Sequence, residues 1–322
     1  MDLSVVVPTL NGRDRLAACL DGVAAHAPDA EVVVVNGPSA DGTTGMVRDR
    51  DDVDVLVEIS DRTVNVARNA GIEVATGDAV ALVNYDNRID ESWVDGVVDG
   101  LGRAGVVTGP VGSAAHDAAD ADDPFSAEAD GDAAADRTDY PERRQIAGRD
   151  VTYFAGGNVA FRREVLRDLD GFDEYLHTGG SRDTAHRLAR MDHEIVWNDA
   201  VAVTNEPASQ PAADGGRVER DWRWKYRALA YRLAKNYGIR PTVLGRTGKH
   251  AVTDAASTAR DVISGEATPS GWAAHGRDVL MGIAGGSADG MVARARDRTP
   301  RRNPNGLSAR ADRAVAKYDR RE

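Results

Sequence analysis

A short polar segment, Asn84–Asn87, follows directly after the apolar run Ala79–Val83. The run has the composition of a buried parallel strand, and polar groups at its end cost free energy unless they bind something. The Asp86 carboxylate and the neighbouring amides are hard oxygen donors that suit Mg²⁺ or Mn²⁺. Mg²⁺ commonly takes one or two protein carboxylates plus substrate phosphates, so Asp86 suffices for a substrate with a diphosphate. Asn and Asp also form turns, and a plain turn is the alternative interpretation.

Two other polar sites follow the same logic. Asn36 comes directly after four valines, and its carboxamide offers both a donor and an acceptor, which suits the imide edge of a uracil or another base. Arg68 and Asn69 lie in a segment with helical periodicity, from which they could reach a diphosphate or a ribose. For Arg68, a solvated surface position is the alternative.

Apolar periodicity predicts the elements that must position these residues. Buried strands are expected at 3–8, 30–37, 53–59 and 79–85, and helices at 13–27, from Ser39 onward, and at 63–76. This strict alternation predicts an α/β fold, with a mostly parallel sheet and helices on both faces. Such sheets bind ligands beyond the carboxyl ends of their strands, where Asn11, Asn36 and Asn84–Asn87 are expected.

The alternation stops at residues 113–149, an acidic stretch with few apolar residues that we interpret as a surface insertion. A strand, a glycine turn and a helix are expected at 151–166, and one or two strands at 193–206. Residues 221–238 have helical periodicity, and beyond Pro241 we expect short helices separated by glycine and proline. We therefore expect a catalytic domain over 1–215 and a helical C-terminal region over 216–322.

Composition limits the class of protein. The chain has 322 residues, of which 42% are hydrophobic, enough for one large domain or two smaller ones. It has no run of about 18 apolar residues that would span a membrane, and no basic segment precedes the first strand as in a signal peptide. The single cysteine, Cys19, excludes disulfide frameworks and cysteine metal sites. We expect a cytoplasmic location.

The charge is unusual in two ways. The chain has 39 Asp and 36 Arg but only 4 Lys, with a net charge of −12, which is typical of halophilic proteins; GC-rich codon usage is the alternative. Residues 217–322 carry a net charge of +11, whereas residues 1–216 carry −23. This asymmetry suggests different partners for the two parts. The acidic part argues against extended nucleic-acid binding.

Four segments together resemble the family-2 glycosyltransferases of the GT-A fold, in order and spacing, over about residues 3–205. They are "LSVVVPTLNGRDRLAACLDGV", "VVVNGPSADGT", "VARNAGIEVATGDAVALVNYDN" and "FAGGNVAFRREVLRDLDGFDE". The chain is similar in particular to archaeal members from halophiles. The resemblance implies a nucleotide-sugar donor with a metal-bridged diphosphate, and inverting transfer to an acceptor hydroxyl.

The resemblance also implies roles for individual residues. Asn36 would stand where the family often has the Asp that contacts the base, and Asp41 would brace that loop. Asn84 and Asp86 would occupy the two ends of the Asp-x-Asp motif, with Asp86 binding the metal. The remaining implied site residues border the nucleotide (Pro8, Thr9, Asn11) or line the acceptor side (Gly156, Gly157, Asn158).

Two departures from the family pattern stand out. Asn84 replaces the first acid of Asp-x-Asp, for which a second carboxylate such as Asp90 could compensate. Counting back from Arg187, Ser181 stands where the usual catalytic Asp lies. We therefore expect Asp183 to be the catalytic base, with Glu174 in reserve.

The helix expected at 221–238, with Arg220 just before it, combines aromatic and basic residues, and membrane contact through residues 220–237 is one interpretation. The aromatic stripe of this helix could pack in a core, lie in a membrane interface or bind RNA. "RDWRW" also resembles a variant of the family's Gln-x-x-Arg-Trp motif, which adds Arg220 and Trp224 to the acceptor side. A basic rear region beside an acidic catalytic domain suits an acceptor glycan carried on a polyprenyl phosphate, with peripheral membrane contact.

Two other functions stay open at this point. Ser181 favours a non-catalytic protein that binds a nucleotide or a sugar. A sugar-phosphate nucleotidyltransferase would share the α/β architecture, but "PTLNGRDRL" matches its glycine-rich loop poorly. No Gly-x-Gly-x-x-Gly follows the first strand, which argues against a dehydrogenase.

Overall fold

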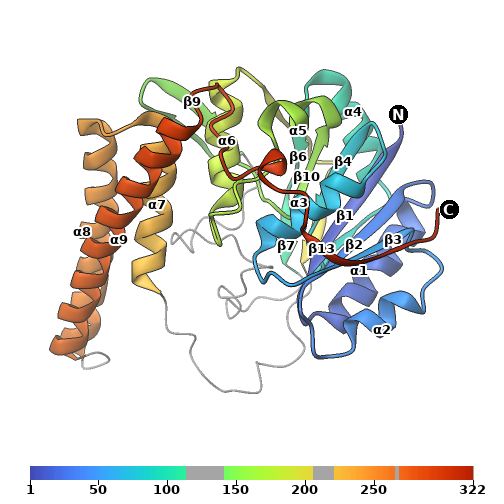
Figure 1. Cartoon of the computed structure of the whole chain (residues 1–322), viewed down its shortest axis with the longest axis horizontal. Coiled ribbons are helices and arrows are strands. Elements are labelled where there is room, and N and C mark those ends of the chain that lie inside the picture. The colour runs from blue at the N-terminus through green and yellow to red at the C-terminus, as the bar shows by residue number, and fades with distance from the viewer. Residues whose placement is uncertain (114–140, 206–220, 265–267, 322) are drawn as a thin grey trace. The chain divides into compact units, whose positions relative to one another are not determined.

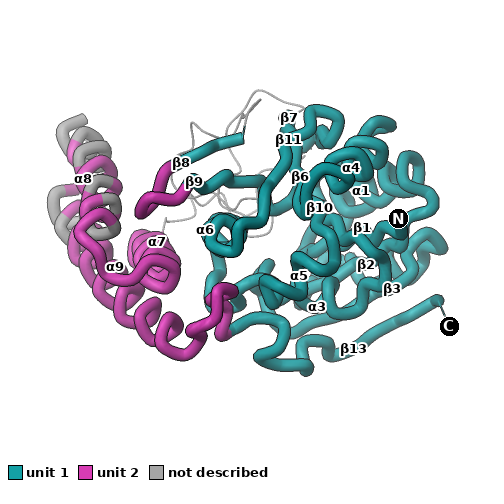
Figure 2. The backbone as a smooth tube through the Cα atoms, turned by 90° about the horizontal axis from the view of Figure 1, so that it is seen from above, with its two compact units in different colours: residues 1–144, 150–216, 305–322 teal, residues 145–149, 217–304 magenta. Residues whose placement is uncertain are grey.

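The computed structural model describes residues 1–113, 141–205, 221–264 and 268–321. They form two compact units (Figure 2). Unit 1 comprises residues 1–144, 150–216 and 305–322, and unit 2 comprises residues 145–149 and 217–304. Residues 305–322 thus belong with the first part of the chain, which corrects the expected C-terminal region over 216–322.

Unit 1 is built on an eight-stranded sheet (Figure 1) with the order β11-β6-β10-β4-β1-β2-β3-β13. The strands are β1 (Leu3–Thr9), β2 (Glu31–Asn36), β3 (Val55–Ile59), β4 (Ala79–Val83), β6 (Val106–Thr108), β10 (Asn158–Arg162), β11 (Ile195–Trp197) and β13 (Ala314–Asp319). β1 to β4 pair in parallel, as do β6 and β11, whereas β10 and β13 are antiparallel to their neighbours. The predicted mostly parallel sheet is confirmed, and β4 ends at Val83 rather than Tyr85.

Helices cover both faces of this sheet, as predicted. A Cβ on Gly71 of α3 (Val64–Val74) would lie 2.3 Å from Val6 Cγ1, and one on Gly100 of α4 (Trp93–Arg103) would lie 2.2 Å from Val107 Cγ2. The strand register places Val107 level with Val5 across β10, β4 and β1. Because successive strand residues point to opposite faces, α3 and α4 pack on opposite sides.

The other elements of unit 1 connect or flank these layers. The helices are α1 (Arg13–His26), α2 (Thr43–Arg48), α5 (Arg163–Leu169) and α6 (Gly180–Arg190). A small second sheet contains β5 (Asn87–Ile89), β7 (Val111–Ser113) and β12 (Val203–Asn205). β8 (Arg143–Ile146) and β9 (Arg149–Thr152) form a hairpin at the end of the expected acidic insertion, and residues 145–149 of this hairpin belong to unit 2. Residues 114–140 of that insertion lie outside the described residues.

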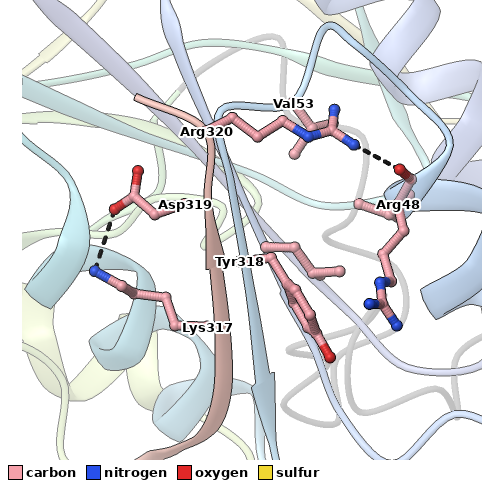
Figure 3. A pocket seen from close by; sticks show the side chains of 8 residues that line it. Arg48, Val53, Lys317, Tyr318, Asp319 and Arg320 are labelled. Carbon is pink, nitrogen blue, oxygen red and sulfur yellow. Dashed lines mark hydrogen bonds and ion pairs between the residues drawn. The ribbon is translucent and has the colours of Figure 1, made fainter. Parts of the chain in front are cut away.

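The C-terminal arm, residues 305–321, returns to unit 1 and ends in β13, which pairs with the edge of β3 (Figure 1). Asp319 of β13 lies opposite Val55 at the start of β3, so the arm ends near the amino edge of the sheet. There a hollow of about 420 Å³ is lined by eight residues (Figure 3), among them Arg48, Lys317, Tyr318, Asp319 and Arg320. The Arg48 guanidinium lies 4.1 Å from the Tyr318 ring centre. This hollow is remote from the strand ends where ligands are expected.

The described residues of unit 2 form three helices: α7 (Trp222–Tyr237), α8 (Pro241–Ser264) and α9 (Pro269–Arg296). The expectation of short helices beyond Pro241 is wrong, because α9 keeps its glycines inside a long helix. Cβ atoms on Gly282, Gly286 and Gly290 would lie 2.1 to 2.4 Å from backbone oxygens of α7. The glycines therefore let two helices approach closely instead of breaking one of them.

Candidate functional site

The carboxyl ends of adjacent strands bring the predicted polar residues to one edge of the sheet. Thr9 and Asn36 are register partners at the ends of β1 and β2, and the amide of Gly37 donates to the Thr9 carbonyl at 2.9 Å. Asn84 begins the loop after β4, and β4 pairs with the edge of β1 opposite to β2. The expectation that these strand ends converge is confirmed. The Thr9 hydroxyl, fully buried, has no hydrogen-bond partner among the described residues.

The segment after β4 is a tight turn held against the start of β10. The amide of Asn87 donates to the Asn84 carbonyl at 3.0 Å, and the Asn87 side chain donates to the Gly157 carbonyl at 2.9 Å. The Asn84 amide donates to the same carbonyl at 3.0 Å. A Cβ on Gly157 would lie only 2.2 Å from Asn84 Cγ. Glycine at 157 is therefore what lets the Asn84 side chain lie in this turn.

Asp86 lies inside this turn and is only 2% exposed. Its Oδ2 is 3.8 Å from a guanidinium nitrogen of Arg15 on α1. The same guanidinium lies 5.0 Å from the ring centre of Tyr85, whose ring edge would be 2.3 Å from a Cβ on Gly12. The turn thus places one carboxylate beside a fixed positive charge at the carboxyl edge of the sheet.

The donor set suits a divalent cation that also binds a substrate. Among the residues that the structure describes, no group of three or more His, Cys, Asp or Glu could hold a metal by itself. Asp90, the expected compensating acid, instead accepts hydrogen bonds from the amide and hydroxyl of Ser92 at 3.0 and 2.8 Å. One carboxylate at Asp86 and the Asn84 amide remain. Such a set fits Mg²⁺ or Mn²⁺ where diphosphate oxygens complete the shell.

The Asn36 carboxamide is used inside the β2–α2 loop. Its oxygen accepts from the Ser39 hydroxyl at 2.7 Å, its nitrogen donates to the Thr44 hydroxyl at 2.9 Å, and the residue is 1% exposed. Asn11, at φ +51°, accepts from the amide of Ala40 and donates its own amide to Ser39, both at 2.8 Å. The geometry makes Asn36 a loop brace and does not support its reaching a base.

Asp41 joins the same loop to the start of α1. Its carboxylate accepts from the amide of Arg13 at 3.0 Å and from the hydroxyl and amide of Thr43 at 2.5 and 3.1 Å. Burial acts to raise the pKa of the Asp41 carboxyl, but these hydrogen bonds outweigh it and lower that pKa below its ordinary value. Asp41 is therefore ionised at neutral pH and holds two loops together.

Arg68 and Asn69 on α3 both point into the protein. The Asn69 side chain donates to the Phe172 carbonyl at 2.9 Å and to Glu174 at 2.8 Å, and accepts from the Phe172 amide at 2.8 Å. Arg68 is 1% exposed, with its guanidinium 5.2 Å from the Phe172 ring centre. The solvated alternative for Arg68 is wrong, and contact between Asn69 and a diphosphate is not supported, because its amide is bound inside unit 1.

Asn158 is likewise an internal anchor rather than an acceptor-lining residue. Its side chain is fully buried, donates to the Val201 carbonyl at 2.7 Å and accepts from the indole of Trp93 at 3.1 Å. Asn158 therefore ties β10 to the loop before β12. This geometry does not support the expected acceptor role of Asn158, while Gly157 lies beside the strand-end turn.

Asp183 on α6 forms a fully buried ion pair. Its Oδ2 accepts from Arg187 Nε at 2.9 Å, and neither side chain is exposed. Arg187 also donates to the carbonyls of Leu169 and Gly171 at 2.7 and 2.8 Å. A general base must reach the proton it removes, so this geometry favours a positioning role for Asp183. Ser181, at the family's base position, is 3% exposed.

Glu174 anchors the C-terminal arm. It accepts from Arg310 at 2.9 Å and from the fully buried Arg313. Arg310 also reaches Asp61, after β3, at 3.0 Å. Both carboxylate oxygens of Glu174 are thus engaged by arginines of the arm, which does not support the expected reserve role of Glu174 as a base. No sequence signal pointed to Arg310 or Arg313, because their partners lie far away along the chain.

The aromatic stripe of α7 is part of the core of unit 2. Tyr226, Leu229, Leu233 and Tyr237 are each at most 8% exposed. The core-packed alternative is therefore confirmed, and membrane contact through this stripe is not supported. The amide of Trp224 donates to the Asp221 cap at 2.8 Å; Arg220 lies outside the described residues. No described helix is both long and apolar enough to cross a membrane.

Comparisons with known proteins agree with this geometry. A family model described as glycosyl transferase family 2 matches residues 4–170. Glycosyltransferase AglE of Haloferax volcanii is 27% identical over 210 residues, which cover 61% of this chain and 64% of AglE. Pre-mycofactocin glycosyltransferase of Mycobacterium tuberculosis is 25% identical over 232 residues, or 69% of this chain and 44% of that protein. This chain spans less than two thirds of both relatives.

Two solved structures share the fold. TarS 1-349 of S. aureus in complex with UDP-GlcNAc has a TM-score of 0.54 and 17% identity, and covers 74% of this chain and 68% of that chain. Mannosyltransferase PcManGT of Pyrobaculum calidifontis, in complex with GDP-Man and Mn²⁺, has a TM-score of 0.51 and 20% identity. The match covers 92% of this chain and 88% of that chain. These likenesses identify unit 1 as a GT-A fold, as predicted.

Proposed function

Because this chain belongs to glycosyltransferase family 2, we propose that it transfers a sugar from a nucleotide-sugar donor to a hydroxyl group of a glycan, with inversion at the anomeric carbon. The observation that carries the proposal is the edge where β1, β2 and β4 end, with Asp86 inside a turn beside Arg15. Structures of two proteins with this fold contain a nucleotide sugar, which supports a donor of that class here.

Each residue at this edge has a proposed task. Thr9, with Pro8 before it, borders the nucleotide, and the loop held by Asn11, Asn36 and Asp41 forms the wall beside it. Asp86 and Asn84 would hold Mg²⁺ or Mn²⁺. When bound, this ion would offset the negative charge that develops on the departing diphosphate. Arg15 adds a fixed positive charge at the same place.

Removal of the acceptor proton requires a general base. Asp183 remains the better candidate base, because it lies in the helix that matches the family's catalytic motif. It would act only after its ion pair with Arg187 opens. A second function, binding of a nucleotide sugar without transfer, is favoured by Ser181 and by the ion pairs that hold Asp183 and Glu174.

The acceptor we propose is a glycan carried on a polyprenyl phosphate. Its glycan hydroxyl would meet the donor at the carboxyl edge of unit 1, near Gly156 and Gly157. Such an acceptor places the enzyme in the cytoplasm against the membrane. The excess of Asp over Lys in the chain suits a cytoplasm with concentrated salt.

Calorimetric titration with UDP-, GDP- and dTDP-sugars in molar KCl tests the donor site. Wild type should bind one nucleotide class with Mn²⁺ and lose that binding with chelator. Asp86→Ala should lose it as well, whereas Asp95→Ala, which removes an exposed carboxylate on α4, should keep it. Folded wild-type protein that binds none of these donors would contradict the proposal.

Turnover separates the two functions. Release of the nucleoside diphosphate in the presence of a glycolipid extract is expected for a transferase, and Asp183→Asn should reduce release while donor affinity stays unchanged. Donor binding without any release would favour the non-catalytic function.

A further inference from the structure

The outer face of α9 carries a continuous apolar stripe. Every exposed residue of this helix between Leu280 and Ala295 is apolar. Leu280 is 69% exposed, Met281 and Val292 are 51% exposed, and Met291 is 37% exposed. The full set, which we name the α9 stripe, is Leu280, Met281, Ala284, Ala288, Met291, Val292 and Ala295.

The seven residues share one side of the helix. At 3.6 residues per turn they fall within an arc of about 120°, and the stripe is about 22 Å long. The opposite side of α9 is already used, because Gly282, Gly286 and Gly290 pack against the backbone of α7. The stripe therefore contributes nothing to the α7–α9 contact. A contiguous exposed apolar face of this kind marks an interaction site.

Positive charge lies at both ends of the stripe. The exposed arginines Arg277 and Arg296 lie just beyond its two ends. By sequence, unit 2 contains 18 basic and 8 acidic residues, a net charge of +10, whereas unit 1 sums to −22. An anionic surface would attract unit 2 and repel unit 1, so the net charges favour docking through unit 2, the unit that carries the stripe.

We propose that unit 2 docks on an anionic lipid bilayer through the α9 stripe, with the apolar side chains at the boundary between headgroups and acyl chains. This combination of apolar face and flanking arginines is how interfacial helices bind membranes without crossing them. The inference deepens the proposed location at the membrane and rests on it. Its test needs no sugar donor, so docking and sugar transfer can fail separately.

A second copy of the chain fits the stripe less well. If two α9 helices paired in parallel, Arg277 would face Arg277; if they paired antiparallel about the middle of the stripe, Arg277 would face the end that carries Arg296. Either arrangement places like charges side by side, which is destabilising. A bilayer of anionic lipid instead neutralises both arginines.

Vesicle flotation of the full chain tests the inference. Vesicles of phosphatidylcholine alone and vesicles with added phosphatidylglycerol would be compared at low and at molar KCl. Wild type should float with the anionic vesicles, and more so at low salt because salt screens the attraction. Met281→Glu/Met291→Glu should lower the bound fraction at least tenfold. The matched control is Val98→Glu, which changes an exposed apolar residue (46% exposed) on α4 of unit 1 and should leave binding unchanged.

Three results would overturn the inference. Wild type could fail to float with any vesicle, or the double variant could float like wild type. In the third, wild type would not bind vesicles but would form a dimer in size-exclusion chromatography, and the double variant would lose that dimer. This result would assign the stripe to contact with a second copy of the chain. Circular dichroism must show that the double variant keeps its helices. If Met281→Glu/Met291→Glu is unfolded, Arg277→Glu/Arg296→Glu replaces it and should also lose binding to anionic vesicles. Persistent binding by this second variant would likewise overturn the inference.

Discussion

The two units differ in net charge and in the contacts that form their cores. Unit 1 is acidic overall, and its core consists of valine-rich strands; near the strand ends, the side chains of Asn87 and Asn158 donate to backbone carbonyls. Unit 2 is basic overall, and its core is a close contact between two helices, with glycines of α9 against the backbone of α7. The comparison shows that one chain can build a proposed ligand-facing edge from strand ends in one unit and a close helix pair from glycine contacts in the other.

The largest expected effect breaks unit 1 without touching unit 2. Arg313 is fully buried and paired with Glu174 and Glu73, and removing one partner of a buried ion pair costs about 3–5 kcal/mol. Arg313→Ala should therefore increase hydrogen exchange in β3, β13 and residues 170–174, but not in α7 or α9. Lys317→Ala is the control, because its exposed pair with Asp319 is worth about 0–1 kcal/mol. Equal deprotection of both units would show that they unfold together.

A pair of neighbouring glycines tests unit 2 in the same way. A Cβ on Gly286 would lie 2.1 Å from the Arg227 carbonyl, whereas one on Gly285 would meet only the Arg227 side chain, at 3.5 Å. Gly286→Ala should destabilise unit 2 by about 1–3 kcal/mol through overpacking. Gly285→Ala should be neutral or stabilise it by up to about 1 kcal/mol, since Ala favours the helix. Thermal unfolding followed by circular dichroism measures both, and shifts of the same sign would contradict the α7–α9 packing.

A smaller effect is expected for the link between α7 and α8. The Tyr226 hydroxyl donates to Asp254 at 2.7 Å, and Lys225 contacts the same carboxylate oxygen at 2.7 Å. Burial and the Asp254 charge both raise the pKa of the Tyr226 phenol. Tyr226→Phe should cost about 1.5 kcal/mol, the lower range for a hydrogen bond to a charged group, because Lys225 still pairs with Asp254. Urea unfolding would reveal it, and an unchanged midpoint would argue against this link.

The smallest effect concerns acid stability of unit 1. Burial acts to raise the pKa of Glu31, but hydrogen bonds from Ser4, Thr76 and Arg321 outweigh it, so that the pKa lies below its ordinary value of 4.5. The stability that Glu31 contributes is therefore complete above about pH 4.5 and is lost as the pH falls towards the folded-state pKa. Melting temperatures between pH 7 and pH 3.5 should fall less steeply for Glu31→Gln than for wild type. Parallel curves for the two proteins would contradict this role.

Local patterns predicted the first half of unit 1 well. The runs that became β1 to β4 alternate with helices over short distances, so apolar periodicity alone placed their carboxyl ends at one edge. β13 was missed because Ala314–Asp319 is a mostly exposed edge strand, whose only evidence is its pairing with β3 from far along the chain. α9 was missed as a long helix because its glycines suggest breaks until their contact with α7 is known.

The site residues divide along the same line. The position of Asp86 follows from its place after a strand, which the sequence contains. The internal roles of Asn69 and Asn158 depend on backbone carbonyls and amides of distant segments, and a carboxamide looks the same in sequence whether it binds a ligand or the protein. The prediction that Asp183 or Glu174 is the catalytic base has a related weakness, because the sequence does not show which arginines pair with these carboxylates.

The return of the C-terminal arm to unit 1 also has a consequence for synthesis on the ribosome. β3 lies at the edge of the sheet until β13 is made, and Arg313 reaches Glu174 only after residues 217–304 of unit 2 have been made. Unit 1, although it begins at the N-terminus, is therefore completed after unit 2. Until then the nascent chain exposes an unpaired strand edge, the kind of surface on which chains aggregate and chaperones act.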